Sequence, residues 1–277
     1  MKNYLIMLCG LAMALCLNSC GGGDGDGEKT PEPATKPLNI TVFIDLSDRV
    51  TRDNVVPSQP ERDTAVVNLL VDYFINRCVE QKIVPCKDCM RVLFYPTPNN
   101  PAIVGWASDL KVDLSAEDVG NKRKVLAAMK NKFDASLNNI YKEVLGSKEW
   151  LGCDIWAFFS GKKVDVQCMK DGYRNILIIL TDGYLYYEPN KVKQGNAYSY
   201  VLPETLKNPN SSLIVKRKGL KDLEVLVLEV NPYAPDQKPQ LFSVLETWFT
   251  GMEVGKLDIV ETDITPNVQP YIEAFLK

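Results

Sequence analysis

Histidine is absent from the 277 residues of this chain. Without it, the chain cannot build a Ser–His–Asp triad, a Cys–His catalytic pair or an imidazole metal ligand. No GxxxxGK[ST] segment occurs, which speaks against an NTPase P-loop, and the glycines between positions 21 and 27 follow no predicted strand, which speaks against a dinucleotide fingerprint. These absences favour a protein that is not an enzyme.

Charge of one sign is also scarce. The formal net charge is −3, so a nucleic-acid partner is not expected. Hydrophobic residues make up 45% of the chain, which is ample for one core of ordinary size and short for two full domains. The apolar run from Tyr4 to Leu17 is too short for a typical membrane-spanning helix.

The N-terminus resembles a lipoprotein signal. Lys2 precedes the apolar run, and Leu17-Asn18-Ser19-Cys20 follows it. We therefore expect a signal peptide over residues 1–19 and a lipid on Cys20, which would anchor the protein in the bacterial cell envelope, at the outer membrane, facing either the periplasm or the surface. A plain secretory peptide with a chance cysteine is the alternative.

Residues 20–37 form the predicted tether. The first part is rich in Gly and Asp and the second in Pro, so a flexible spacer is followed by a stiffer one. The folded domain is then expected over residues 38–277.

Two buried strands end in a carboxylate and a hydroxyl. Ile40–Ile44 is followed by Asp45 and Ser47, and Ile176–Leu180 by Thr181 and Asp182. In an open α/β sheet, ligands sit beyond the carboxyl ends of the strands, at the point where the strand order reverses. We therefore expect both aspartates at one edge of the sheet.

Strands and helices are predicted to alternate along the chain. This pattern indicates an α/β fold: a doubly wound, mostly parallel central sheet flanked by helices, in three layers. The segment 183–220 lacks a regular pattern and is a candidate binding or lid element. The other strands are expected at 90–95, 102–106 (a short edge strand), 223–230 and 256–260, and the helices at 61–82, 121–145, 153–161, 237–250 and 267–276.

The two strand ends resemble those of von Willebrand factor A-type domains. These domains carry DxSxS after the first strand and an Asp after a later one, and here the chain reads Asp45-Leu46-Ser47-Asp48-Arg49 and Thr181-Asp182-Gly183. The family's middle Thr lies in a segment like GGTDI, and Gly152-Cys153-Asp154-Ile155 is the nearest match. The chain thus departs from the family twice, with Arg49 at the second Ser and Cys153 at the Thr.

The resemblance implies a metal-ion-dependent adhesion site in which Asp45, Ser47 and Asp182 bind Mg²⁺ or another divalent cation. The two departures oppose this, because Arg49 repels a cation and a thiol is too soft for Mg²⁺. Either Arg49 replaces the metal by pairing with Asp45 or Asp182, or Asp48 restores it with another carboxylate. The possible neighbours of the site are Asp48, Arg49, Cys153, Asp154 and Thr181.

Five cysteines remain after the signal and the lipidation site. The Cys86-Lys87-Asp88-Cys89 motif follows a predicted helix rather than opening one, which argues against a thioredoxin-like enzyme. With no histidine to add a fourth ligand, zinc is also disfavoured. We expect a local disulfide of Cys78 with Cys86 or Cys89, and Cys153 with Cys168 is a second candidate.

Together these features predict a lipid-anchored, exported A-type domain that binds a protein partner through the strand ends. A small hydrolase or phosphotransfer-like enzyme that uses Asp45 at the switch point is one alternative. A structural envelope-assembly protein with a dead site is the other.

Overall fold

A computed structural model describes residues 36–51, 56–96, 98–147, 153–184, 192–194, 197–199, 217–231, 235–261 and 265–277. The predicted signal peptide, the lipidation site Cys20 and nearly all of the tether lie outside these residues, as does most of the segment 183–220. None of the described helices has the length and apolar character needed to cross a bilayer.

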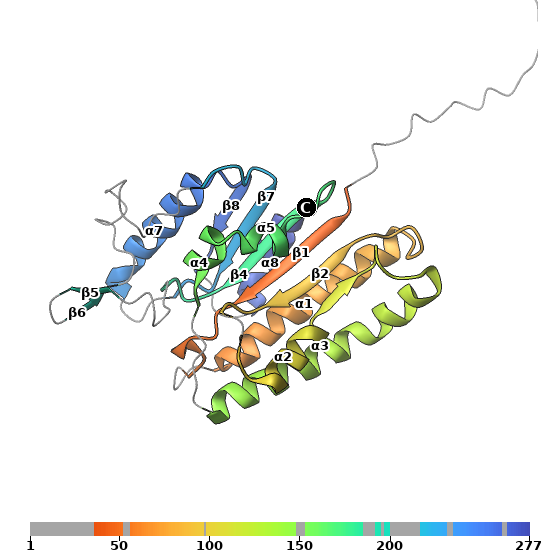
Figure 1. Ribbon diagram of the computed structural model, residues 1–277, viewed down its shortest axis with the longest axis horizontal. Helices are drawn as coiled ribbons and strands as arrows, with labels where there is room; N and C mark the ends of the chain where they lie inside the picture. The colour runs from red at the N-terminus through yellow and green to blue at the C-terminus, as the bar shows by residue number, and fades with distance from the viewer. Residues whose placement is uncertain are drawn as a thin grey trace, which may run out of the picture. The chain divides into compact units, whose positions relative to one another are not determined.

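The central sheet has six strands in the order β3-β2-β1-β4-β7-β8 (Figure 1). Every neighbouring pair is parallel except β2 and β3, which run antiparallel. The prediction of a mostly parallel α/β sheet is confirmed. The strands are β1 (Leu38–Ile44), β2 (Cys89–Leu93), β3 (Lys111–Asp113), β4 (Arg174–Leu180), β7 (Leu223–Leu228) and β8 (Lys256–Ile259). A separate antiparallel pair joins β5 (Val192–Gln194) and β6 (Ala197–Ser199).

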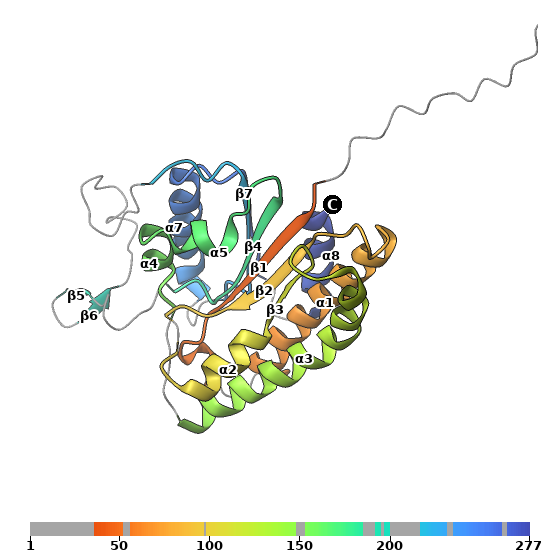
Figure 2. The ribbon, with the colours of Figure 1, turned by 45° about the vertical axis from the view of Figure 1, so that its right-hand side comes forward.

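Helices cover both faces of the sheet (Figure 2). Alternate side chains of β1 explain why: Ile40, Val42 and Ile44 pack into one apolar cluster and Phe43 into the other. One face is covered by α1 (Gln59–Glu80), α3 (Val119–Ser147) and α8 (Thr265–Leu276). The other is covered by α4 (Ile155–Ser160), α5 (Lys163–Cys168) and α7 (Lys238–Gly251).

The predicted edge strand over residues 102–106 is wrong, because these residues lie in α2 (Pro101–Asp109). Asn100 caps this helix: its side chain accepts a hydrogen bond from the Ala102 N–H at 2.9 Å. Pro101 stands at the first helical position, where its missing N–H is not needed. The outermost strand on the β2 side of the sheet is instead the three-residue strand β3.

The strand order reverses between β1 and β4. From β1 the chain moves outward to β2 and β3, and it then returns to place β4 on the other side of β1. The register pairs Ile44 with Leu180, so both strands end at the same level. The residues that follow them lie at the switch point, where open α/β folds hold their ligands.

Candidate functional site

Asp45 is completely buried at the end of β1. Its backbone N–H donates to the Leu180 carbonyl at 3.0 Å, which extends the pairing with β4. The side chain accepts from the Ser47 N–H at 2.8 Å and from the Thr181 hydroxyl at 2.8 Å, one bond to each oxygen. Both carboxylate oxygens of Asp45 are therefore already engaged within the protein.

Asp182 follows Thr181 at the end of β4 and is 5% exposed. Its Oδ1 accepts a hydrogen bond from the Tyr184 N–H at 3.2 Å. The buried Cys153 thiol lies within the electrostatic influence of both Asp45 and Asp182, and burial first, then these carboxylates, raise its pKa well above the usual range. The residues flagged at the two strand ends thus gather around one edge of the sheet.

Arg49 occupies the centre of this edge and is 1% exposed. It belongs to η1 (Asp48–Thr51), the short turn that follows β1. Its Nε donates to the Asp45 carbonyl at 2.9 Å and lies 3.9 Å from Asp45 Oδ2, while Nη2 contacts Asp63 at 2.8 Å and Nη1 contacts Glu229 at 3.2 Å. We call Arg49 and these three carboxylates the arginine cluster.

Two further side chains donate hydrogen bonds to the carboxylates of the arginine cluster. The Tyr141 hydroxyl on α3 donates to Asp63. The Gln59 amide, at the start of α1, donates to Asp63 at 3.0 Å and to Glu229 at 2.5 Å. Four segments distant in sequence therefore meet at Arg49, and charge-assisted hydrogen bonds hold them together.

The sequence prediction missed four members of this arrangement: Gln59, Asp63, Tyr141 and Glu229. Glu229 was detectable, because it ends the apolar strand β7 as Asp45 and Asp182 end theirs. Asp63 was also detectable, as an acid on the same helical stripe as Val66, Val67 and Leu70. Gln59 and Tyr141 carry no comparable signal.

Glu229 adopts an unusual conformation. Its backbone φ is +66°, a left-handed conformation that a non-glycine residue holds only when its surroundings enforce it. Its Oε1 is buried and has no hydrogen-bond partner among the described residues. Burial, followed by the charge of Asp63, raises the pKa of Glu229 well above the usual range. Because one guanidinium faces three carboxylates, the surroundings of Glu229 favour its protonated form more than water does.

This raised pKa predicts a pH dependence of stability. A carboxyl whose pKa is raised on folding stabilises the folded state fully below its unfolded pKa, and that contribution is lost as the pH rises through the folded pKa. Wild-type protein should therefore lose unfolding free energy as the pH rises above about 5, the region in which an unfolded Glu is already ionised. In Glu229→Gln this slope should become shallower, and burial of Asp45, which raises the pKa of that carboxyl, should account for what remains; urea unfolding at several pH values measures the difference.

The matched control is Glu246→Gln, which removes an exposed carboxyl on α7. This variant should keep the wild-type slope. An equally steep slope in Glu229→Gln would mean that Glu229 is ionised throughout the range.

The residues at this edge do not fit a divalent cation in the arrangement described. The family's second Ser is replaced by a guanidinium 3.9 Å from Asp45 Oδ2, and this fixed charge repels a metal ion. Cys153, at the position of the family's Thr, is 1% exposed and offers only a soft thiol. The metal site of Asp45, Ser47 and Asp182 stays a prediction, and magnesium titration of the protein tests it.

Two other flagged neighbours have local structural roles. Asp48 is exposed and begins η1, and its carbonyl accepts a hydrogen bond from the Thr51 hydroxyl at 2.7 Å. Asp154 is 4% exposed and caps α4, where it accepts from the Ala157 N–H at 2.7 Å. Asp48 is thus the flagged acid that solvent or a partner reaches most easily.

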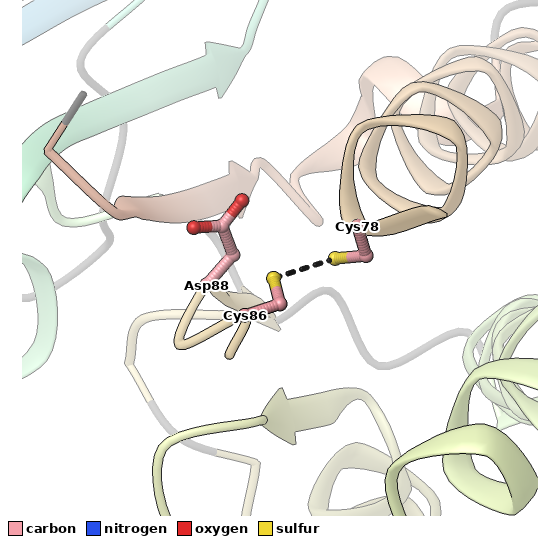
Figure 3. Close-up of side chains that lie close together, drawn as sticks. All are labelled: Cys78, Cys86 and Asp88. Carbon is pink, nitrogen blue, oxygen red and sulfur yellow. Dashed lines mark hydrogen bonds between the residues drawn. The ribbon is translucent and has the colours of Figure 1, made fainter. Parts of the chain in front are cut away.

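A second polar cluster lies near the start of the domain, where α1 ends and β2 begins. Cys78 and Cys86 point toward each other with their sulfurs 3.3 Å apart (Figure 3). Neither forms a disulfide here, and Cys89, Cys153 and Cys168 are also free thiols. The predicted bonds of Cys78 with Cys86 or Cys89, and of Cys153 with Cys168, therefore stay predictions.

Cys78, Cys86 and Asp88 lie close enough to share a metal ion. However, both oxygens of Asp88 already accept hydrogen bonds, from the Leu38 N–H at 2.9 Å and from Arg77 at 3.0 Å. The Lys122 ammonium also donates to the Cys86 carbonyl at 2.7 Å. Arg77 and Lys122 would repel a metal ion, and both oxygens of Asp88 are already engaged. The Cys78–Cys86 pair therefore favours a disulfide over a metal site.

No protein-family model matches the chain, and no curated protein matches its sequence. Among solved structures, it is similar to the conserved hypothetical protein BatB from Bacteroides thetaiotaomicron, with 12% identity, a TM-score of 0.43, and coverage of 86% of this chain and 97% of that one. It is also similar to the pilus adhesin SpaC from Lactobacillus rhamnosus GG, with 10% identity and a TM-score of 0.40. That match covers 87% of this chain but 30% of the SpaC chain.

Proposed function

We propose that this protein is a lipid-anchored, exported A-type domain that binds a protein partner at the carboxyl edge of its sheet. One observation carries the proposal: the chemically capable side chains at the switch point are buried and paired with one another. Asp45 is fully buried with both oxygens engaged, so the contacts give it no access to a substrate as a nucleophile or base. The buried, paired residues at the carboxyl ends of the strands therefore favour binding of a partner protein over the alternative role as a hydrolase or phosphotransfer-like enzyme.

Arg49 serves in this proposal as a permanent cation in place of the metal. It links the loop after β1 to Asp63 on α1 and to Glu229 after β7. A metal ion bound by carboxylates from several loops would link them in the same way. A guanidinium provides up to five donors in a fixed plane and stays charged at any physiological pH. Partner binding should therefore be insensitive to chelators.

Site-specific cross-linking tests the location of the partner surface. Asp48 is exposed at the carboxyl edge, and Lys87 is exposed in the turn before β2, at the opposite edge. Full-length protein carrying p-benzoylphenylalanine at position 48 should give a discrete protein adduct in intact cells, with or without EDTA, and the same group at position 87 should not. No adduct at position 48, or equal adducts at both positions, would contradict the proposal.

The lipid anchor and the envelope location are part of the same proposal. Their support is the order of Lys2, the apolar run and Cys20 at the N-terminus. Metabolic labelling with palmitate should mark the wild-type protein, and Cys20→Ala should remove the label and release the protein from the outer-membrane fraction. A labelled Cys20→Ala variant would overturn the assignment of the lipid to this residue.

The oxidising envelope also predicts a disulfide between Cys78 and Cys86, formed by exchange with the disulfide of an envelope thiol oxidase. The bond would tie the end of α1 to the start of β2 across a short loop, and it should add roughly 2–3 kcal/mol to the free energy of unfolding.

Mass spectrometry of protein purified from the envelope checks this prediction, with trypsin digestion before and after reduction. Cys78→Ser/Cys86→Ser should match the reduced wild-type protein in thermal stability. Alkylation of both Cys78 and Cys86 in non-reduced envelope protein would show that the bond is not formed.

A further inference from the structure

A groove of about 400 Å³ lies on the outer part of the sheet, bordered by β2, α2 and α5. On this face, Phe43 of β1 and Ile179 of β4 are fully covered, whereas Leu93 and Tyr95 remain partly exposed. The reason is the length of the covering helices: α4 and α5 have only six residues each and leave the strip beyond β1 open. A volume of this size is typical of a small-molecule site.

The floor of the groove is apolar. Tyr95 packs edge-to-face against the buried Phe158, with ring centroids 5.7 Å apart, and both residues line the groove. Val104, on α2, also lines it and is 44% exposed. These three side chains offer an apolar ligand a surface from which water is readily displaced.

Three cations line the same groove: Arg91, Lys111 and Lys163. No Asp or Glu is among the lining residues that the structure describes. The nearest acids in sequence are engaged elsewhere, since Asp109 pairs with Lys132 at 2.9 Å and Asp165 pairs with Arg217 at 2.7 Å. The groove is therefore a local concentration of positive charge on a chain whose net charge is −3.

The Arg91 guanidinium is only partly satisfied. Its Nη1 donates to the Gln167 side chain at 3.1 Å, whereas its Nε is buried and has no hydrogen-bond partner among the described residues. A buried N–H of a charged group without a partner is costly, and an anion held close to the guanidinium would lower that cost by offsetting its charge. Among the described residues, neither Lys111 nor Lys163 forms an ion pair that would compete for such an anion.

We propose that this groove binds a small amphipathic carboxylate, a molecule with one carboxylate head and an apolar body. The head would lie among Arg91, Lys111 and Lys163, and the body would lie on Tyr95, Phe158 and Val104. The combination of three cations with an aromatic floor selects for both halves of such a ligand. This site is separate from the arginine cluster and does not depend on the proposed protein-binding role.

Calorimetric titration with decanoate below its micellar concentration tests the proposal. Decanoate should bind with a stoichiometry of one, whereas decan-1-ol lacks the charge, acetate lacks the apolar body, and both should fail to bind in the same range. Raising the salt concentration should weaken decanoate binding, because the cations at the groove mouth are screened. Equal binding of decanol would overturn the assignment of the three cations to the head group.

Variants give the second arm of the test. Lys111→Gln/Lys163→Gln should raise the Kd for decanoate about tenfold or more, which corresponds to the loss of charge-assisted contacts. The matched control, Lys124→Gln/Lys142→Gln, removes two exposed charges from α3 and should leave the Kd unchanged. Thermal unfolding without ligand should be the same in both variants, since all four side chains are exposed.

Two outcomes would reject the site. One is an equal Kd in the two double variants, which would show that decanoate binds elsewhere. The other is binding of an acidic peptide, such as Asp-Phe-Glu-Phe, without any binding of decanoate, because the groove would then be a peptide-docking surface rather than a small-molecule site.

Discussion

Replacement of Arg49 by alanine is expected to lower the free energy of unfolding by about 3–5 kcal/mol, because it removes the cation from a buried group of three carboxylates. The remaining acids are between 0% and 4% exposed, so water cannot solvate their charge. They must either take up protons or repel one another. For a unit of this size, the change corresponds to a fall in Tm of roughly 6–20 °C.

Thermal and urea unfolding of Arg49→Ala, Arg49→Lys and wild-type protein measure this effect. Arg49→Lys should be intermediate, since an ammonium keeps the charge but cannot span Asp63 and Glu229 in one plane. Arg123→Ala removes an exposed arginine from α3 and should change the free energy of unfolding by less than about 0.5 kcal/mol. If Arg49→Ala is as stable as Arg123→Ala, the cluster contributes nothing to the fold.

The pH should modify this result in a specific direction. In Arg49→Ala, the carboxyl groups lose the charge that favours their ionised forms, so their pKa values rise further. Lowering the pH from about 8 toward 5 should therefore recover more stability in Arg49→Ala than in the wild-type protein. A uniform loss at every pH would assign the effect to lost packing around the arginine side chain rather than to charge.

The central strands were predictable because each is a run of consecutive residues without charge. Ile40–Ile44 and Ile176–Leu180 contain no charged side chain, and this is the pattern of strands covered on both faces. The polar residues directly after these runs, Asp45 and Thr181, showed where the strands end. A buried run that ends abruptly in Asp and Ser or Thr places those side chains at one level once the strands pair in parallel.

The error at residues 102–106 came from treating a short apolar run as a strand. Four of its five residues are small or branched apolar side chains or glycine, a composition that short strands and helices share. Asn100 and Pro101 together were the missed signal, since this pair caps and starts a helix. Local cap chemistry was more informative here than hydrophobicity.

The arginine cluster was predictable only at its first member. The sequence left two alternatives open at this edge, a pairing of Arg49 with Asp45 or Asp182 and a metal ion restored by Asp48, and the structure places Arg49 against Asp45. Local patterns mark Asp63 and Glu229 as buried acids, but they do not show that both contact Arg49, because this depends on where α1 docks and on the backbone after β7. Glu229 also adopts a left-handed backbone conformation, which cannot be predicted from a glutamate at this position.

Substitution of Arg49 by serine should convert the edge of the sheet into a magnesium site. The change restores the serine that the DxSxS pattern requires, two residues after Ser47, and removes the guanidinium that lies 3.9 Å from Asp45 Oδ2. Asp45, Ser47 and Asp182 would then present hard oxygen donors without an opposing charge. We expect Mg²⁺ at 100 times its Kd to add about 2.7 kcal/mol to the free energy of unfolding of Arg49→Ser.

Thermal unfolding with EDTA and then with excess Mg²⁺ makes the comparison. Wild-type protein should unfold at the same temperature in both, whereas Arg49→Ser should gain several degrees with Mg²⁺ and lose the gain when Asp182→Ala is added. Cys153→Thr in the Arg49→Ser background should tighten Mg²⁺ binding, since a hydroxyl replaces a soft thiol.

Stabilisation of the wild-type protein by Mg²⁺ would instead mean that a metal binds at this edge despite Arg49, at the site of Asp45, Ser47 and Asp182 that the sequence resemblance implied. Failure of both Arg49→Ser and its Cys153→Thr derivative to respond would show that the edge has lost the geometry of a metal site altogether. In that case the contacts of Arg49 with Asp63 and Glu229 would be what joins these segments in a metal-free protein.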